Sequence, residues 1–118
     1  MEECTEIAIL LDFYGQLLTP RQFEILDLHY NADYSLGEIA GQLRISRQGV
    51  YDGVKKGKET LKHYEDKLGL AERFMKQMEV LRQVLMNLQE ARAGIIKEDE
   101  KKRISYCIKE LERIIKEL

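Results

Sequence analysis

The chain has 118 residues, of which 44% are hydrophobic and 34% are charged, and its formal net charge at pH 7 is −2. This length fits one domain, or one small domain with an arm. The charge balance excludes a uniformly basic nucleic-acid-binding protein, so any such function must rest on a local patch. With a single proline and many leucine, isoleucine, glutamate and lysine residues, the composition predicts an all-α protein.

The first predicted helix covers residues 5–18, where apolar side chains recur at helical spacing. These side chains are Ile7, Leu10, Leu11, Tyr14, Leu17 and Leu18. Thr19 then provides an N-cap, and Pro20 suits the first position of a second helix. The second helix ends near residue 31, and the residues expected to face inward are Phe23, Leu26 and Tyr30.

Ser35 can cap a third helix over residues 36–43, because Glu38 stands three residues later and completes a capping box. Its apolar face consists of Ile39, Ala40 and Leu43. After a break at residues 44–46, Ser46 is a natural N-cap for a fourth helix that starts at residue 47. That helix runs to Gly69, a residue suited to ending it. Its inward positions are Val50 and Val54, and it continues through Leu61, Tyr64 and Leu68.

The third and fourth helices predict a helix-turn-helix over residues 36–57, in which a small residue belongs where the two helices touch. Ala40 is that residue, and Ile45 in the turn can fill the gap between the helices. Gly49, Gly53 and Gly57 recur on one face of the fourth helix. Two interpretations are open: these glycines permit close approach by a ligand or another helix, or they leave the helix locally weak.

The predicted recognition helix lies in a basic stretch, because residues 44–62 contain six lysines or arginines and only two acidic residues, Asp52 and Glu59. Arginine and glutamine can make two-point contacts with base edges, and the first turns of a recognition helix usually meet the bases. The candidates for contact with bases or with RNA are Arg47, Gln48, Tyr51 and Lys55. The candidates for phosphate contact are Lys56, Lys58 and Lys62. Asp52 opposes this interpretation, and a solvated polar helix face is the alternative.

Residues 70–118 have a different pattern, with two heptad seams separated by a charged break at residues 92–100. The seam positions are Ala71, Phe74, Met78, Leu81, Leu85 and Leu88, followed by Ile104, Ile108, Leu111, Ile115 and Leu118. Two such helices with a short connection predict an antiparallel helical hairpin that serves as a packing or dimerisation arm. The first half, the partner helix or a second copy must cover the seams, and we expect a homodimer.

The sequence shows no catalytic constellation, no glycine-rich phosphate loop and no metal-ligand spacing, so we expect neither an enzyme nor a bound metal or cofactor. Cys4 and Cys107 are far apart and are expected to be small buried hydrophobes in a reducing compartment. No apolar run approaches the roughly 18 residues of a membrane span. The acidic start also lacks the basic region of a signal peptide. We therefore expect a cytoplasmic protein without membrane insertion.

Most of the chain closely resembles the YlxM-like family of small bacterial proteins. The resemblance rests on LLDFYG…LLT (10–19), Q-x-x-x-L-D-L-x-Y (22–30), SLGEIA (35–40), ISRQ-x-VYD (45–52) and YE-x-KL-x-L (64–70). The family is similar to region 4 of bacterial sigma factors, which implies a helix-turn-helix at about 36–57 in a domain spanning residues 1–69. The family's recognition helix matches this chain at Ser46, Arg47, Gln48, Val50, Tyr51 and Asp52.

YlxM-like proteins are associated with the signal recognition particle pathway, so the resemblance implies a regulator or an accessory factor of that pathway. The first hypothesis is a DNA-binding regulator whose dimer presents two recognition helices to half-sites about 34 Å apart. The second is an accessory factor that binds the particle's RNA through the same basic helix, its protein through the acidic first helix and the heptad helices, or both.

Overall fold

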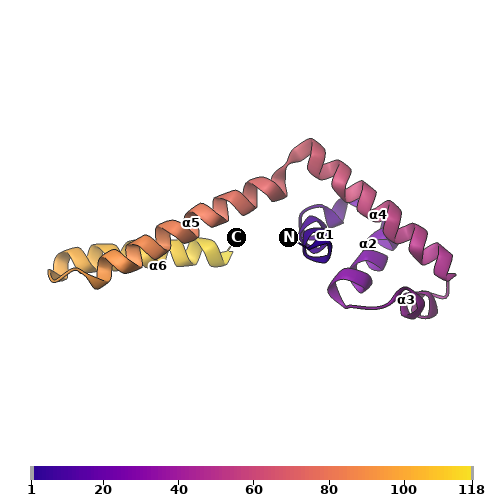
Figure 1. Ribbon diagram of the computed structural model, residues 1–118, viewed down its shortest axis with the longest axis horizontal. Coiled ribbons are helices and arrows are strands. Elements are labelled where there is room, and N and C mark those ends of the chain that lie inside the picture. Colours follow the sequence, from indigo (N-terminus) through magenta and orange to yellow (C-terminus); the bar gives the residue numbers. More distant parts are fainter. Residues whose placement is uncertain (1, 118) are drawn as a thin grey trace. The chain divides into compact units, whose positions relative to one another are not determined.

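The computed structural model describes residues 2–117, and all regular structure among them is helical, which confirms the predicted all-α class (Figure 1). The chain divides into two compact units between residues 72 and 73. The first unit contains α1 (Glu3–Tyr14), η1 (Gly15–Leu17), α2 (Pro20–Leu26), η2 (Asp27–Asn31), α3 (Leu36–Leu43) and α4 (Arg47–Leu68). The second contains most of α5 (Leu70–Ala93) and all of α6 (Glu98–Glu117).

The predicted helix starts are confirmed by their hydrogen bonds. Thr19 and Ser35 both form capping boxes, in which the Gln22 and Glu38 side chains accept from the N-cap backbone N–H at 3.2 and 3.1 Å. Ser46 caps α4, because its hydroxyl accepts the backbone N–H three residues later at 2.9 Å. These caps satisfy donors that a helix cannot pair internally, so short polar sequences set where α2, α3 and α4 begin.

The core of the first unit forms around α4, and α1, α2 and α3 lie along one side of that helix (Figure 1). Each of these four helices contributes side chains that are almost completely buried: Ile7, Tyr14, Leu26, Ile39, Val50 and Leu61. Because α4 shares this core with all three shorter helices, its opposite face is left for solvent or a ligand.

Phe23, which was predicted to face inward, is instead 39% exposed, and two further apolar positions of the predicted helices, Leu17 and Leu68, are 54 and 47% exposed. At Leu17 the chain tightens from α1 into a 3₁₀ turn, which rotates this side chain outward. Ile25 occupies the core in place of Phe23. Leu68 is the last residue of α4, directly before the left-handed Gly69 that ends the helix.

The two cysteines are also exposed, so the prediction that they are small buried hydrophobes is wrong. Cys4 lies in the first turn of α1, one turn before Ile7, which is the first buried residue of that helix. Cys107 adjoins the buried Ile108, but one residue along a helix turns the side chain by about 100° away from the seam.

The hairpin of the second unit follows the predicted seams. α5 and α6 lie side by side and are joined by residues 94–97 (Figure 1). Met78 and Ile108 are buried, and the other described seam positions from residue 74 onward are half-buried. The last predicted seam position, Leu118, lies outside the described residues. The two helices thus cover one another only in part.

Two of the three glycines of α4 allow a close contact between α4 and α2. A Cβ atom at Gly57 would lie 2.6 Å from Cδ1 and 3.0 Å from Cγ of Leu26, and one at Gly53 would lie 2.8 Å from Ile25. The interpretation that survives for these two positions is therefore close approach by another helix, α2. Gly49 differs, because a Cβ atom there would lie 3.1 Å from the hydroxyl of Ser46, the residue that caps α4, and not against another helix.

A second constraint joins α1 and α4 to the start of α5 through the Glu65 carboxylate. It accepts hydrogen bonds from the Tyr14 hydroxyl at 2.6 Å and from the backbone N–H groups of Ala71 and Glu72 at 3.1 and 2.9 Å. The Tyr14 hydroxyl in turn accepts the Leu70 N–H at 3.1 Å. Glu65 therefore acts as a side-chain cap for a helix that begins five residues later.

Gly57→Ala is expected to lower the free energy of unfolding by about 1–3 kcal/mol, because the added methyl group overlaps a fully buried Leu26. Gly41→Ala is the matched control, since nothing lies within 4 Å of a Cβ atom there, and it should stabilise by up to about 1 kcal/mol. Urea unfolding followed by circular dichroism measures both. Equal effects of the two changes would show that helix propensity, and not packing, governs α4.

Glu65→Gln is expected to lower the free energy of unfolding by about 1–3 kcal/mol at neutral pH, because an amide offers one oxygen and no charge to three donors. Burial alone would raise the pKa of Glu65, but the hydrogen bonds from Tyr14, Ala71 and Glu72 lower the pKa on balance. A lowered pKa means that the native protein loses this stabilisation as pH falls through the folded-state value.

The stability difference between native protein and Glu65→Gln should therefore be present at neutral pH and shrink as the pH falls below the ordinary carboxylate range. The measurement is urea unfolding of both proteins over a series of pH values from neutral into acid. A difference that is as large in acid as at neutral pH would contradict the role of the charged carboxylate.

Candidate nucleic-acid interface

The turn between α3 and α4 has the geometry of a helix-turn-helix. Arg44 ends α3 with φ 58° and ψ 46°, a left-handed conformation that glycine usually supplies at helix ends. The next residue, Ile45, donates its N–H to the Ala40 carbonyl at 3.1 Å and packs against the core. Ala40 and Val50 are both buried. The predicted residues thus lock the two helices together.

The four candidates for base or RNA contact come together on the exposed side of α4. Arg47, Gln48, Tyr51 and Lys55 occupy its first three turns, and all four are exposed. Tyr51 is the one aromatic side chain among these four, and 52% of its surface is accessible. The predicted set therefore forms one continuous surface that begins at the helix N-terminus.

Two of these side chains are positioned by neighbours. The Arg47 guanidinium lies over Gly37 at the start of α3, where a Cβ atom would be 3.3 Å from both Nε and Nη2. The Gln48 amide donates to an Asp52 carboxylate oxygen at 3.1 Å, one turn along α4. Asp52 is itself exposed, so this hydrogen bond both orients Gln48 and places a negative charge on the surface.

The three phosphate candidates do not form one equivalent set. Lys56 and Lys62 are exposed, and neither makes an ion pair with another described residue. Lys58 is half-buried, and its ammonium donates to Glu3 of α1 at 2.7 Å. This hydrogen bond raises the pKa of Lys58 and lowers the pKa of Glu3. Lys58 therefore already has an anionic partner within the chain.

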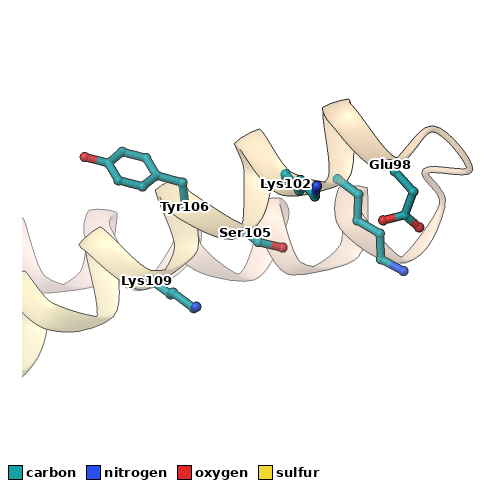
Figure 2. Close-up of a pocket in the computed structure, with 6 residues that line it drawn as sticks. Glu98, Lys102, Ser105, Tyr106 and Lys109 are labelled. Carbon is teal, nitrogen blue, oxygen red and sulfur yellow. The ribbon is translucent and has the colours of Figure 1, made fainter.

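A second basic surface on α6 was not among the predicted site residues. Lys101, Lys102 and Lys109 border a shallow hollow of about 370 Å³, together with Ser105, Tyr106 and one acidic residue, Glu98. Figure 2 shows Lys102, Ser105 and Lys109 along α6, with Tyr106 projecting beside them. The sequence did contain a signal for this surface, because residues 101–109 include four basic residues and no acidic one.

The described residues contain no group of three or more His, Cys, Asp or Glu side chains arranged to hold a metal ion. None of the helices described between residues 2 and 117 is both long and apolar enough to cross a membrane. The two basic surfaces of the described residues, the exposed face of α4 and the basic side of α6, are the candidate nucleic-acid interfaces.

Comparison with known proteins identifies the family. Residues 1–104 match the model of UPF0122, described as "Putative helix-turn-helix protein, YlxM / p13 like". The chain belongs to the UPF0122 family. It is 46% identical over 115 residues to a UPF0122 protein of Acetivibrio thermocellus, and the alignment covers 98% of each chain. It is also 43% identical over 113 residues to a relative in Thermoanaerobacter sp., covering 95% of this chain and 92% of the relative.

The UPF0122 match confirms the resemblance drawn from the sequence segments and extends it into α6. A relative in Geobacillus sp. is 40% identical over 114 residues, and the alignment covers 97% of this chain and 98% of the relative. The family description names a helix-turn-helix protein, in agreement with the α3–turn–α4 geometry.

Proposed function

We propose that this UPF0122 protein is a non-enzymatic, cytoplasmic DNA-binding regulator that uses α4 as its recognition helix. The main support for this proposal is the exposed surface at the start of α4, which consists of Arg47, Gln48, Tyr51 and Lys55. Helix-turn-helix proteins present this part of the second helix to base edges in the major groove. The exposed Lys56 and Lys62 extend the same helix toward phosphate.

Each side chain has a chemical role in this proposal. Arg47 can make a bidentate contact with guanine, and Gln48 with adenine. Lys55, Lys56 and Lys62 lower the free energy of binding by releasing counterions from phosphates. We leave Lys58 out of this surface because Glu3 already neutralises it. Asp52 limits affinity, since its carboxylate is exposed on the same helix.

Arg47→Ala combined with Lys55→Ala is expected to abolish binding to duplex DNA while helix content stays unchanged, because both side chains are exposed and outside the core. Fluorescence anisotropy with a random duplex pool at two salt concentrations measures the effect. If residual binding is detectable, its salt dependence should be shallower by about two units in the slope of log K against log salt.

Arg21→Ala combined with Lys67→Ala is the matched control, because it removes two exposed positive charges of the same unit from outside the proposed surface. Asp52→Asn is the converse change and should tighten binding several-fold by removing repulsion of phosphate. Equal loss in the two double variants would mean that only net charge matters and that α4 is not the DNA-binding surface.

We also propose that the hairpin pairs with a second copy of this chain. Val80, Val84 and Ile114 are exposed by 62, 41 and 39%, and a hollow of about 530 Å³ is lined by Val80, Leu81 and Ile114. A single recognition helix buries little surface, whereas a two-fold dimer offers two such helices to a site with two half-sites. The half-covered seam is consistent with a four-helix arrangement.

Val80→Lys combined with Ile114→Lys is expected to yield a monomer that remains helical, because the two charges would be buried in a dimer but are solvated in the single chain. Light scattering after size-exclusion chromatography measures the mass. Ile96→Lys is the control, because this side chain is 94% exposed in the loop between α5 and α6. A native protein with the mass of one chain would contradict the proposed pairing.

The basic side of α6 favours a second candidate function, an accessory factor of the signal recognition particle pathway that binds the particle's RNA or protein. Lys101, Lys102 and Lys109 supply phosphate contacts, and Tyr106, 66% exposed, offers a ring for stacking on an unpaired base. The association with this pathway comes from the resemblance to YlxM-like proteins.

The same anisotropy assay separates the two candidates when structured RNA replaces duplex DNA. Binding of RNA that survives the change of Arg47 and Lys55, but is lost in Lys102→Ala with Lys109→Ala, would favour the accessory function. Preference for duplex DNA, lost with Arg47 and Lys55, favours the regulator.

A further inference from the structure

The first unit contains a cavity of about 540 Å³ beside the proposed recognition surface. Residues of α1, η2, α3 and α4 line it, and Tyr51 and Lys55 belong both to this cavity and to the exposed surface of α4. Sites for small molecules typically have volumes of about 300–1,000 Å³. The cavity is therefore large enough for a ligand the size of a nucleotide.

Its lining combines flat and aliphatic surfaces. Tyr30 and Tyr51 supply two aromatic rings from different elements, and Leu36 and Val54 supply aliphatic side chains. The Tyr30 ring is also held by an edge-to-face contact with His29, with ring centroids 4.9 Å apart. Aromatic rings of this kind stack on planar ligands, so the cavity favours a ligand with a flat ring system.

The charges around the cavity favour an anion. Lys55 and Lys58 contribute two positive charges, and the one carboxylate that lines the cavity belongs to Glu3. That carboxylate lies 2.7 Å from the Lys58 ammonium and is largely exposed. Lys55 makes no ion pair with any described residue. The Glu3 carboxylate thus lies where a ligand's anionic group could bind Lys58, and Lys55 is a second positive charge on the same lining.

His29 adds a polar group at the edge of the cavity. Its Nδ1 lies 2.9 Å from the Tyr34 carbonyl oxygen, and a carbonyl only accepts, so we assign the hydrogen to Nδ1. Nε2 is then the remaining ring nitrogen, an acceptor in the neutral ring and a donor after protonation. The lining therefore offers hydrogen-bonding partners for a ligand's hydroxyl or phosphate groups in addition to the two lysines.

We propose that this cavity binds a nucleoside phosphate, whose ring contacts the two tyrosines and whose phosphate displaces the Glu3 carboxylate from Lys58. This competition rests on the proposed DNA binding: the nucleotide competes with duplex DNA because both use Tyr51 and Lys55. Through this competition, a small anionic effector would reduce DNA binding by α4.

The test is isothermal titration calorimetry of the full chain with adenosine and guanosine 5′-monophosphate, with adenosine, guanosine and inorganic phosphate as the separate halves. At least one nucleotide should bind more tightly than either half. Glu3→Gln should bind it several-fold more tightly, because the competing carboxylate is gone. Lys58→Gln should bind it about tenfold more weakly, from the loss of a charge-assisted contact. Lys67→Gln is the control and should leave the affinity unchanged.

Circular dichroism and a melting curve of each variant establish that the fold is retained. No binding of either nucleotide by the native protein and by Glu3→Gln overturns the proposal, and so does equal affinity in Lys58→Gln. Anisotropy with duplex DNA and no nucleotide tests the proposed function separately. Nucleotide binding without DNA binding would overturn the proposed function but not the nucleotide site. Simultaneous binding of nucleotide and DNA would overturn only the proposed competition between them.

Discussion

The close approach of α2 to α4 is the constraint on which the first unit depends. Gly53 and Gly57 remove the Cβ atoms that would otherwise meet Ile25 and Leu26, so two core residues of α2 lie directly on the α4 backbone. This contact fixes which side of α4 is buried. The opposite side, which carries Arg47 and its neighbours, is exposed as a consequence. Helix propensity is lost at these glycines, and packing compensates for the loss.

The start of α5 is governed by hydrogen bonding. A helix that begins immediately after Gly69 leaves backbone N–H groups without internal partners. Glu65 supplies a carboxylate to two of them, and the Tyr14 hydroxyl accepts a third. Burial and the hydrogen bond to Glu65 raise the pKa of Tyr14, so this hydroxyl stays protonated and continues to donate. One tyrosine of α1 therefore connects the core to the end of α4.

Local signals of the sequence were sufficient for the starts of α2, α3 and α4, because Thr19, Ser35 and Ser46 act on the next few residues alone. The inward faces were harder to predict. Phe23 was assigned to the core by spacing, whereas Ile25 holds that place because it packs on Gly53, a contact between segments 28 residues apart. The pairing of Lys58 with Glu3 is similarly long-range. Periodicity within one helix contains no information about either contact.

In the DNA binding proposed for α4, the small excess of positive charge on its exposed face limits the electrostatic contribution. Asp52 and Glu59 offset two of its lysines, and Glu3 neutralises Lys58. Binding strength must then come from base contacts, from a second recognition helix, or from both. The low charge has a further consequence: one additional anion in the cavity next to Tyr51 and Lys55 would remove a large share of the remaining attraction. A weakly basic recognition helix is therefore more easily regulated by a small anion than a strongly basic one.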